Sequence, residues 1–372
     1  MPHPRVTRMS DAQPVEAAGP QPALDKKKTA IMAAVGLVAL VLIFVKVIPQ
    51  IGSYDEAFKA IEAMNGFDIA VIVVAVLIYN TVYGFPFMAA VPGLAYPRSF
   101  QLNQGAFASS NGVPAGGAFG LGVQYAMLAS YEVPPTVATA AIGATGVWSI
   151  FVTLGLPVFG LMAIAASGAM TDVGKYVYIG ALGLGVLITM IVVFARIMRS
   201  EPLAIRIGGW ANALAKPAYK VFKKDAPDLV PVVVKFRTDT VALVTRRWHV
   251  ITVSQIAVSL CQFGIFYAAL RGVEGGQTPT PFLVAFGAWA VAQIGIMIPI
   301  TPGGLGTVDA FMISLLTAMG VSGGDATAAT LVWRAASFVP QIAIGVIMLV
   351  TWSRTAARKF AVAKPVDGTA TA

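Results

Sequence analysis

The sequence predicts an all-α, polytopic membrane protein, a bundle of helices that crosses the bilayer several times. Hydrophobic residues make up 57% of the chain and charged residues only 12%, about half the charged share of a typical soluble domain. Mean hydropathy is +0.77 over the 372 residues, so the apolar excess extends along the whole chain. Uncharged runs such as 69–78 and 186–195 are parts of apolar stretches of the roughly 20 residues that a spanning helix needs.

The spans follow a polar leader. Residues 1–29 are rich in Pro, Ala and charge, and we expect them to be disordered. A triple lysine then precedes an apolar stretch that we interpret as a retained first span with its N-terminus inside. The predicted spans are 30–48, 67–90, 135–166, 175–196, 250–270, 281–300 and 326–350.

A basic linker divides the predicted transmembrane domain, 30–350, into two halves at about 67–196 and 247–350. Between 196 and 247 the chain holds eleven Lys and Arg residues against four acidic residues. The positive-inside rule therefore predicts a cytoplasmic linker (197–246), and likewise a cytoplasmic tail (351–372) and N-terminus. Within the linker, 203–222 has the pattern of a basic amphipathic helix lying on the bilayer.

The charge and the scarce metal-binding residues exclude several classes of function. The net charge of +9 comes from basic residues that flank apolar segments, which favours anionic lipid headgroups over nucleic acid as partner. A single cysteine, Cys261, and two histidines, His3 and His249, exclude an internal disulfide and predict no metal centre and no cofactor. No paired carboxylates, Ser–His–Asp set or Cys–His pair is present, so we expect no enzymatic activity.

Two segments are too interrupted for ordinary spans. Residues 96–135 are apolar but crowded with Gly, Pro, Asn and Ser, and 300–306 reads Ile-Thr-Pro-Gly-Gly-Leu-Gly before a short helix at 307–318. Non-helical backbone is tolerated at membrane depth only where protein or water satisfies its polar groups. We therefore predict that both segments form short half-helices that approach each other around one central cavity.

The two interrupted segments also resemble each other. Pro114, Gly116 and Gly117 in the first parallel Pro302, Gly303 and Gly304 in the second, and the Ala-Thr-Ala-Ala of 138–141 recurs at 326–329. Duplicated halves with broken helices indicate a transporter with a central site. The alternative is that the glycines spaced four apart, Gly112, Gly116 and Gly120, form a close-packing helix face.

Two charged residues stand out within the apolar second half. Asp309 follows the second glycine turn and Arg334 lies inside the last span, and intramembrane charges are costly and usually functional. We expect the two to lie close together and to meet a lipid headgroup. The alternatives are that Asp309 only complements the positive helix N-terminus and that Arg334 is a satisfied ion pair or snorkels to the interface.

Neutral groups complete the predicted site. The helix N-termini after both glycine turns favour anions such as a phosphodiester. Asn111 and Gln124 are candidate ligand contacts in the first segment, with helix–helix hydrogen bonding as the alternative. The predicted lipid-binding residues are Asn111, Pro114, Gly116, Gly117, Gln124, Pro302, Gly303, Gly304, Gly306, Asp309 and Arg334.

These motifs resemble the transmembrane region of lysylphosphatidylglycerol synthases, also called the flippase-like domain family. The resemblance lies in the Pro-Gly-Gly-Leu-Gly turn of 302–306, the acidic residue Asp309, where Glu is common in the family, and Arg334 in the last span. The stretches 111–120 and 124–128 resemble the family's first conserved region. The similarity covers roughly 30–350.

The resemblance implies a function in lipid movement. Bifunctional members of that family join the membrane part, which moves the modified lipid between leaflets, to a soluble aminoacyl-transferase domain. That domain is absent here, so the resemblance implies translocation of a phospholipid or polyprenyl-linked lipid across the plasma membrane without synthesis. The alternatives are a non-transporting partner of a membrane enzyme and a secondary carrier of a small amphiphile. A second copy of the chain or a membrane enzyme is the expected protein partner.

Overall fold

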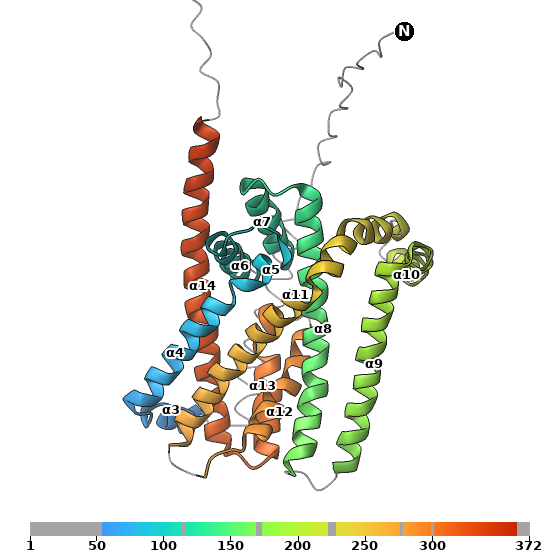
Figure 1. Cartoon of the computed structure of the whole chain (residues 1–372). Helices are drawn as coiled ribbons and strands as arrows, with labels where there is room; N and C mark the ends of the chain where they lie inside the picture. Colours follow the sequence, from blue (N-terminus) through green and yellow to red (C-terminus); the bar gives the residue numbers. More distant parts are fainter. Residues whose placement is uncertain are drawn as a thin grey trace, which may run out of the picture.

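The computed structural model describes residues 54–112, 116–168, 173–221, 228–275, 278–298 and 301–362, which form helices and turns and contain no strand (Figure 1). The predicted first span at 30–48 and the predicted disordered leader lie outside these residues. The helices are α3 (Tyr54–Glu62), α4 (Gly66–Val82), α5 (Phe85–Ala90), α6 (Tyr96–Asn111), α7 (Gly116–Ser130), α8 (Pro135–Ser167), α9 (Val173–Arg199), α10 (Glu201–Val221), α11 (Leu229–Glu274), α12 (Phe282–Ala292), the 3-10 turns η2 (Gln293–Met297) and η3 (Pro302–Gly304), α13 (Thr307–Ala318) and α14 (Gly323–Val362).

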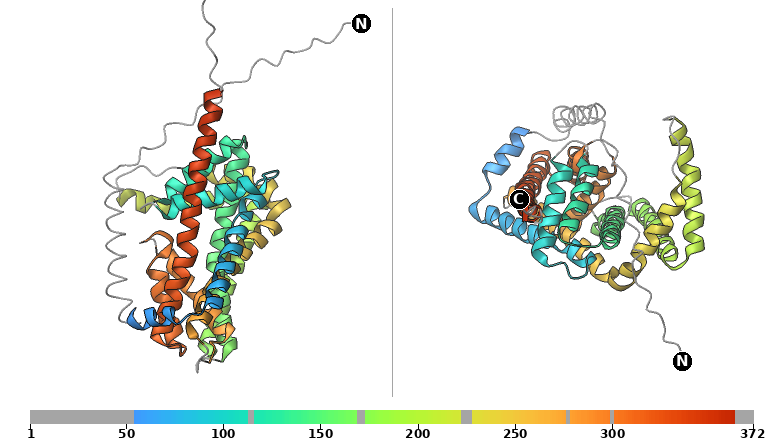
Figure 2. Two further views of the ribbon diagram at one scale, coloured as in Figure 1. Left: turned by 90° about the vertical axis from the view of Figure 1, so that its left-hand side faces the viewer. Right: turned by 90° about the horizontal axis from the view of Figure 1, so that it is seen from above.

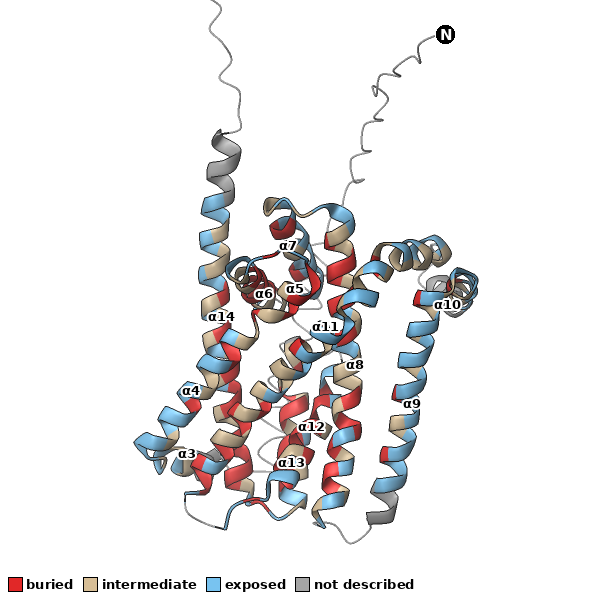
Figure 3. Cartoon of the chain, in the orientation of Figure 1, coloured by how far each residue is buried: buried red, intermediate tan, exposed pale blue. Residues whose placement is uncertain are grey.

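Five helical segments in this part of the chain are long and apolar enough to cross a membrane: Gly66–Ala90, Pro135–Ser167, Val177–Arg199, Leu229–Glu274 and Gly323–Thr355. The chain is therefore an all-α polytopic bundle, as predicted. Large hydrophobic side chains of α4 and α9 are exposed on its outside, where Figure 3 shows mostly exposed residues on both helices. Lipid covers such surfaces in a membrane protein.

The structure adds two features to the second half. The helix that contains the predicted span 250–270, α11, begins at Leu229, so the last part of the basic linker is continuous with the spanning helix. The stretch 281–300 is no span: α12 ends at Ala292 and the chain tightens into η2. At this return a Cβ on Gly295 would lie 2.8 Å from the backbone nitrogen of Val308, so glycine allows the returning chain to pack directly against η2.

The bundle has two distinct ends. Helix α10 and the far end of α14 lie together at one end, which we call the basic end, and Figure 2 shows α14 extending beyond the other helices there. Helix α3, the C-terminal ends of α8 and α11 and the α13–α14 corner lie at the opposite end. The amphipathic segment predicted at 203–222 forms α10, at the edge of the bundle seen from above (Figure 2). The linker and the tail thus share one end, as the charge pattern predicts.

The halves are structurally repeated and inverted. At the α7–α8 corner the Val133 N–H donates to the Leu128 carbonyl at 3.0 Å, and at the α13–α14 corner the Val321 N–H donates to the Leu316 carbonyl at 3.0 Å. Positive φ angles precede both valines, at Glu132 (65°) and Gly320 (95°). Helices α8 and α14, which follow these matching corners, run in opposite directions (Figure 1). The predicted repeat is therefore present, as an inverted-topology repeat of the kind that transporters use.

Candidate functional site

The second glycine turn forms the N-terminal approach to α13. Gly303, Gly304 and Gly306 all have positive φ angles, 62°, 66° and 83°, a region that residues with a Cβ rarely adopt. One carboxylate oxygen of Asp309, Oδ2, accepts a hydrogen bond from the Gly306 N–H at 2.6 Å. Asp309 therefore caps α13, where a negative charge also complements the helix dipole.

Arg334 of α14 ties this turn to the last span. Its Nε donates to Asp309 Oδ1 at 2.5 Å, and its terminal nitrogens donate to the carbonyls of Gly303 at 3.4 Å and Gly304 at 3.2 Å. Asp309 is 1% exposed and Arg334 8% exposed. The prediction that these two charges pair is confirmed.

Aromatic rings complete the surroundings of the guanidinium. Its central carbon lies 4.5 Å from the ring centre of Trp333 and 5.0 Å from that of Phe338, within range of a cation–π interaction. The charge, the carbonyls and the rings satisfy Arg334 within the protein. In this structure the pair holds the turn, so the contact of either residue with a headgroup stays a prediction.

The two interrupted segments meet where their tips approach. A Cβ on Gly303 would lie 2.9 Å from Asn111 Oδ1, at the end of α6. Phe107 of α6 packs against Phe338, with ring centres 5.5 Å apart. The predicted approach of the two segments is confirmed, but the predicted cavity between them is not. Asn111, Asp309, Arg334 and the described residues of the second glycine turn line neither the polar cavity nor the apolar groove described below. Pro302 begins η3 at this junction, and Pro114 lies outside the described residues.

A polar cavity of about 440 Å³ lies beside the junction. Gly117 and Gln124, both predicted site residues, line it. Gly116 does not: a Cβ there would lie 2.5 Å from the Ser109 carbonyl oxygen, so Gly116 is a close-packing position between α6 and α7. The cavity is lined by Tyr83, Pro86, Phe87, Asn103, Ser110, Gly117, Leu121, Gln124, Ile142, Thr145, Gly146, Ser149 and Gln255.

Most of these polar residues were not among the predicted site residues. Thr145 and Ser149 lie four apart on one face of α8, and Gln255 comes from α11 in the other half of the sequence. The i, i+4 spacing of small polar residues in an apolar helix was the available signal for the first two. Nothing local marks Gln255, because only the packing of α11 against α8 brings it here.

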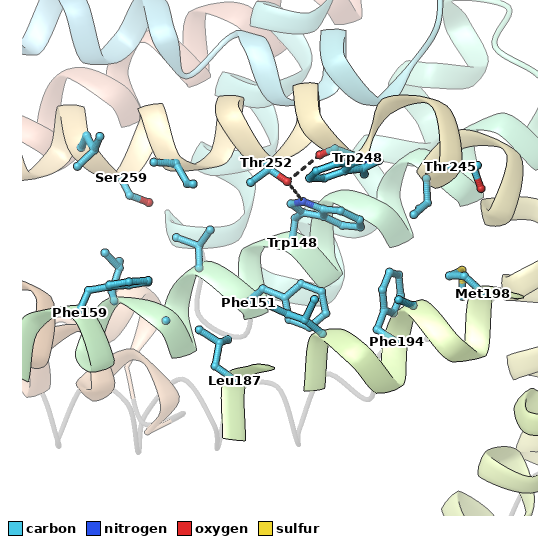
Figure 4. A pocket seen from close by; sticks show the side chains of 18 of the residues that line it. Trp148, Phe151, Phe159, Leu187, Phe194, Met198, Thr245, Trp248, Thr252 and Ser259 are labelled. Carbon is cyan, nitrogen blue, oxygen red and sulfur yellow. Dashed lines mark hydrogen bonds between the residues drawn. The ribbon is translucent and has the colours of Figure 1, made fainter. Parts of the chain in front are cut away.

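An apolar groove of about 750 Å³ lies between α8, α9 and α11 (Figure 4). Aromatic and aliphatic side chains form its walls, among them Trp148, Phe151, Phe159 and Leu187, and Arg199 lies at the α9 end nearest the basic linker. A groove of this composition suits a hydrocarbon chain.

The groove and the cavity share one wall, made by α8 and α11. Trp148 Nε1 donates to Thr252 Oγ1 at 2.6 Å, and Gln255 Nε2 donates to the Thr145 carbonyl at 3.4 Å. Trp148 and Thr252 face the groove, whereas Thr145 and Gln255 face the cavity. Two hydrogen bonds from side chains thus join α8 and α11, the helices that separate the polar cavity from the apolar groove.

Comparison with known families accounts for this architecture. Residues 31–345 match the family described as the lysylphosphatidylglycerol synthase TM region. The chain belongs to this family. The match includes both halves, the Asp309–Arg334 pair and all the residues that line the cavity. The lysylphosphatidylglycerol synthase TM region is a membrane domain associated with lipid modification and flipping. No curated protein shows significant sequence similarity to the chain.

Proposed function

We propose that this protein moves a phospholipid or polyprenyl-linked lipid between the leaflets of the plasma membrane and performs no chemical step on it. The observation that supports the proposal is the polar cavity beside the junction of the two interrupted segments. It is lined by residues of the first half and by Gln255 of α11, in a bundle whose outer surface is apolar. Transporters built from inverted repeats bind their substrates at such a junction of broken helices.

The barrier to lipid movement is the headgroup. Taking an unpaired polar group from water into hydrocarbon costs roughly 2–7 kcal/mol. The acyl chains meet no such barrier, because they stay in the bilayer core throughout. The amides and hydroxyls that line the cavity replace the water lost by the headgroup.

In this proposal Asp309 and Arg334 position the junction. Arg334 fastens the carbonyls of Gly303 and Gly304 to α14, and Gly303 packs on Asn111 of the first segment. The pair therefore maintains the contact between the two segments at the end of α6, one residue after Ser110 of the cavity wall. A headgroup phosphate could contact Arg334 only if the packing between the two segments opened.

Reconstitution into vesicles tests the proposal. Vesicles with head-labelled phospholipid and, in parallel, head-labelled polyprenyl-phosphate lipid are treated with an impermeant quencher, and the fraction of label that becomes accessible is followed in time. We expect the protein to speed exposure of inner-leaflet label in at least one series. Rates equal to those of protein-free vesicles in both series would overturn lipid translocation and favour the non-transporting alternative.

Two glycines of α7 supply a matched pair of variants. A Cβ on Gly117 and a Cβ on Gly122 both meet open space, but only Gly117 lines the cavity. Gly117→Leu fills the cavity and is expected to abolish the acceleration, whereas Gly122→Leu is expected to retain it. Equal rates for these two variants would show that the cavity is not the path of the headgroup.

A further inference from the structure

The inverted repeat relates the residues that line the polar cavity to residues of the second half. With the offset that relates the α13–α14 corner to the α7–α8 corner, Arg334 corresponds to Gly146, which lines the polar cavity. Asp309 corresponds to Leu121 with this offset and to Gly122 with the offset of the paired glycines. The second half thus holds a buried ion pair where the first half has only uncharged residues.

The chemistry of the cavity wall is that of neutral hydrogen bonding. Its polar side chains carry no net charge and are supplied by α6, α7, α8 and α11 and by the turn after α4. They are Tyr83, Asn103, Ser110, Gln124, Thr145, Ser149 and Gln255.

Part of this hydrogen-bonding capacity is unused. Within the described part of the chain, Ser110, Gln124 and Ser149 form no side-chain hydrogen bond with another residue. Asn103 is 7% exposed, and its amide nitrogen donates to Ser99 and to the Gly84 carbonyl. Its Oδ1 accepts no hydrogen bond from a described residue. The wall therefore presents both donors and acceptors to a guest.

Such a wall discriminates between headgroups. A charged group that leaves water needs a counter-charge, and the desolvation penalty for an ion in a protein interior is several kcal/mol. A hydroxyl exchanges its hydrogen bonds with water for equivalent bonds with amides and hydroxyls, at little net cost. The cavity wall offers amides and hydroxyls as hydrogen-bond partners and no counter-charge.

We infer that the polar cavity binds the uncharged, hydroxyl-bearing part of a lipid headgroup, such as a sugar, inositol or glycerol. This inference rests on the proposed function in naming the class of lipid that the cavity accepts. Cationic headgroups are excluded because no acidic residue is among the described residues that line the cavity. Gln124, Asn103 and Ser149 are the expected hydrogen-bond partners of the hydroxyls.

Lipid retention measured without transport tests the inference. The full chain in detergent is offered an equimolar mixture of glucosyl-diacylglycerol, diacylglycerol and a trimethylammonium-propane lipid, all with the same acyl chains. Bound lipids are then counted by native mass spectrometry. We expect glucosyl-diacylglycerol to be retained at least about fivefold over both others, as one to two added hydrogen bonds would give.

Variants assign the preference to the cavity. Gln124→Leu removes one partner and is expected to reduce the preference about fivefold, and Gly146→Leu is expected to abolish it by filling the space. Gly185→Leu on α9 is the control, because a Cβ there also meets open space but away from the cavity. It is expected to keep the wild-type preference.

The outcomes separate this inference from the proposed function. Equal retention of the three lipids, preference for the cationic lipid, or a preference that survives Gly146→Leu would each overturn the inference, even if vesicles show lipid movement. A cavity-dependent preference for the glycolipid without any lipid movement would support the inference and overturn translocation.

Discussion

At the residue scale, the Asp309–Arg334 pair is fully engaged in hydrogen bonds within the protein. Each carboxylate oxygen of Asp309 accepts one hydrogen bond, and the guanidinium of Arg334 holds two backbone carbonyls besides the carboxylate. Because both side chains are buried, removal of one partner leaves the other as an uncompensated charge at membrane depth. Breaking the pair is therefore expected to destabilise the fold by more than the intact pair stabilises it.

A double-mutant cycle measures this coupling. We expect Arg334→Met to lower the free energy of unfolding by about 3 kcal/mol, since an unpaired buried charge costs about that much. Asp309→Asn leaves the arginine unpaired and should cost a similar amount. The double variant Asp309→Asn/Arg334→Met should lose less than the sum of the two. Thermal unfolding of purified protein in detergent gives the comparison, and additive losses would contradict a coupled pair.

At the element scale, small residues decide how closely the helices approach. Helix α14 crosses α6 where a Cβ on Gly345 would overlap the backbone oxygen of Gln104 and lie 2.5 Å from Ala108 Cβ. Close backbone contact of this kind provides van der Waals packing, which drives helix association in a membrane. It also holds α14 against the interrupted segment whose tip contacts Gly303.

Gly345→Ala tests this crossing. The added methyl group forces α14 and α6 apart, and overpacking of this kind typically costs about 1–3 kcal/mol. Gly264→Ala on α11 is the matched control, because a Cβ there meets nothing within 4 Å and alanine is a better helix former by about 0.5–1 kcal/mol. We expect the melting temperature to fall for Gly345→Ala and to hold or rise for Gly264→Ala. A fall of equal size in both would argue against the crossing.

The corner between α10 and α11 is held by a local network. Asp228 caps α11 by accepting from the Val230 N–H at 3.0 Å, and the Asn212 side chain donates to the same oxygen at 2.6 Å. The hydrogen bond from Asn212, followed by that from Val230, lowers the pKa of the Asp228 carboxyl. A carboxyl with a lowered pKa stabilises the folded corner above its unfolded pKa of about 3.9, and this stabilisation is lost as pH falls through the folded pKa.

Amide hydrogen exchange at Leu229 and Val230 reports on this corner. After correction for the intrinsic exchange rate, protection should decrease as pH is lowered below about 4. Asp228→Ala should remove most of the pH dependence and expose the first turn of α11 at neutral pH. Protection that stays constant with pH in the wild type would contradict the role of the carboxylate.

At the scale of the whole molecule, charge and topology agree. The basic linker helix α10, the start of α11 and the far end of α14 lie at one end, and α3 with its acidic residues lies at the other. The positive-inside rule predicts that the basic end faces the cytoplasm. The polar cavity is built mainly from α6, α7 and α8, whose α7–α8 corner is at the basic end (Figure 1).

Single cysteines test this orientation. In a Cys261→Ala background, Asp55→Cys on α3 and Lys235→Cys on α11 place thiols at exposed positions near opposite ends. An impermeant maleimide applied to intact cells should label Asp55→Cys and spare Lys235→Cys, and both should react after permeabilisation. Labelling of Lys235→Cys alone in intact cells would show that the protein has the opposite orientation.

The junction and the charge pair were predictable because their residues carry strong local signals. A Pro-Gly-Gly turn, an acid three residues after Gly306 and an arginine in an apolar helix are each unusual at membrane depth, so each predicts a junction or a charge pair. Gln255 and Tyr83 carry no such signal. They reach the cavity only through the packing of α11 and the end of α4 around it.

The sequence by itself determined the membrane environment, the helical class, the sidedness of the linker and tail relative to each other, and the pairing of Asp309 with Arg334. Hydrophobicity and the cost of isolated charge act on every short stretch separately, so they can be read locally. Only the tertiary structure decided that α12 turns back instead of spanning and that the halves are inverted. It also decided that Gly116 packs against α6 while Gly117 faces a cavity. Those features depend on which helices pack together. A glycine becomes a packing contact where a neighbouring helix lies against it, and part of a cavity wall where none does.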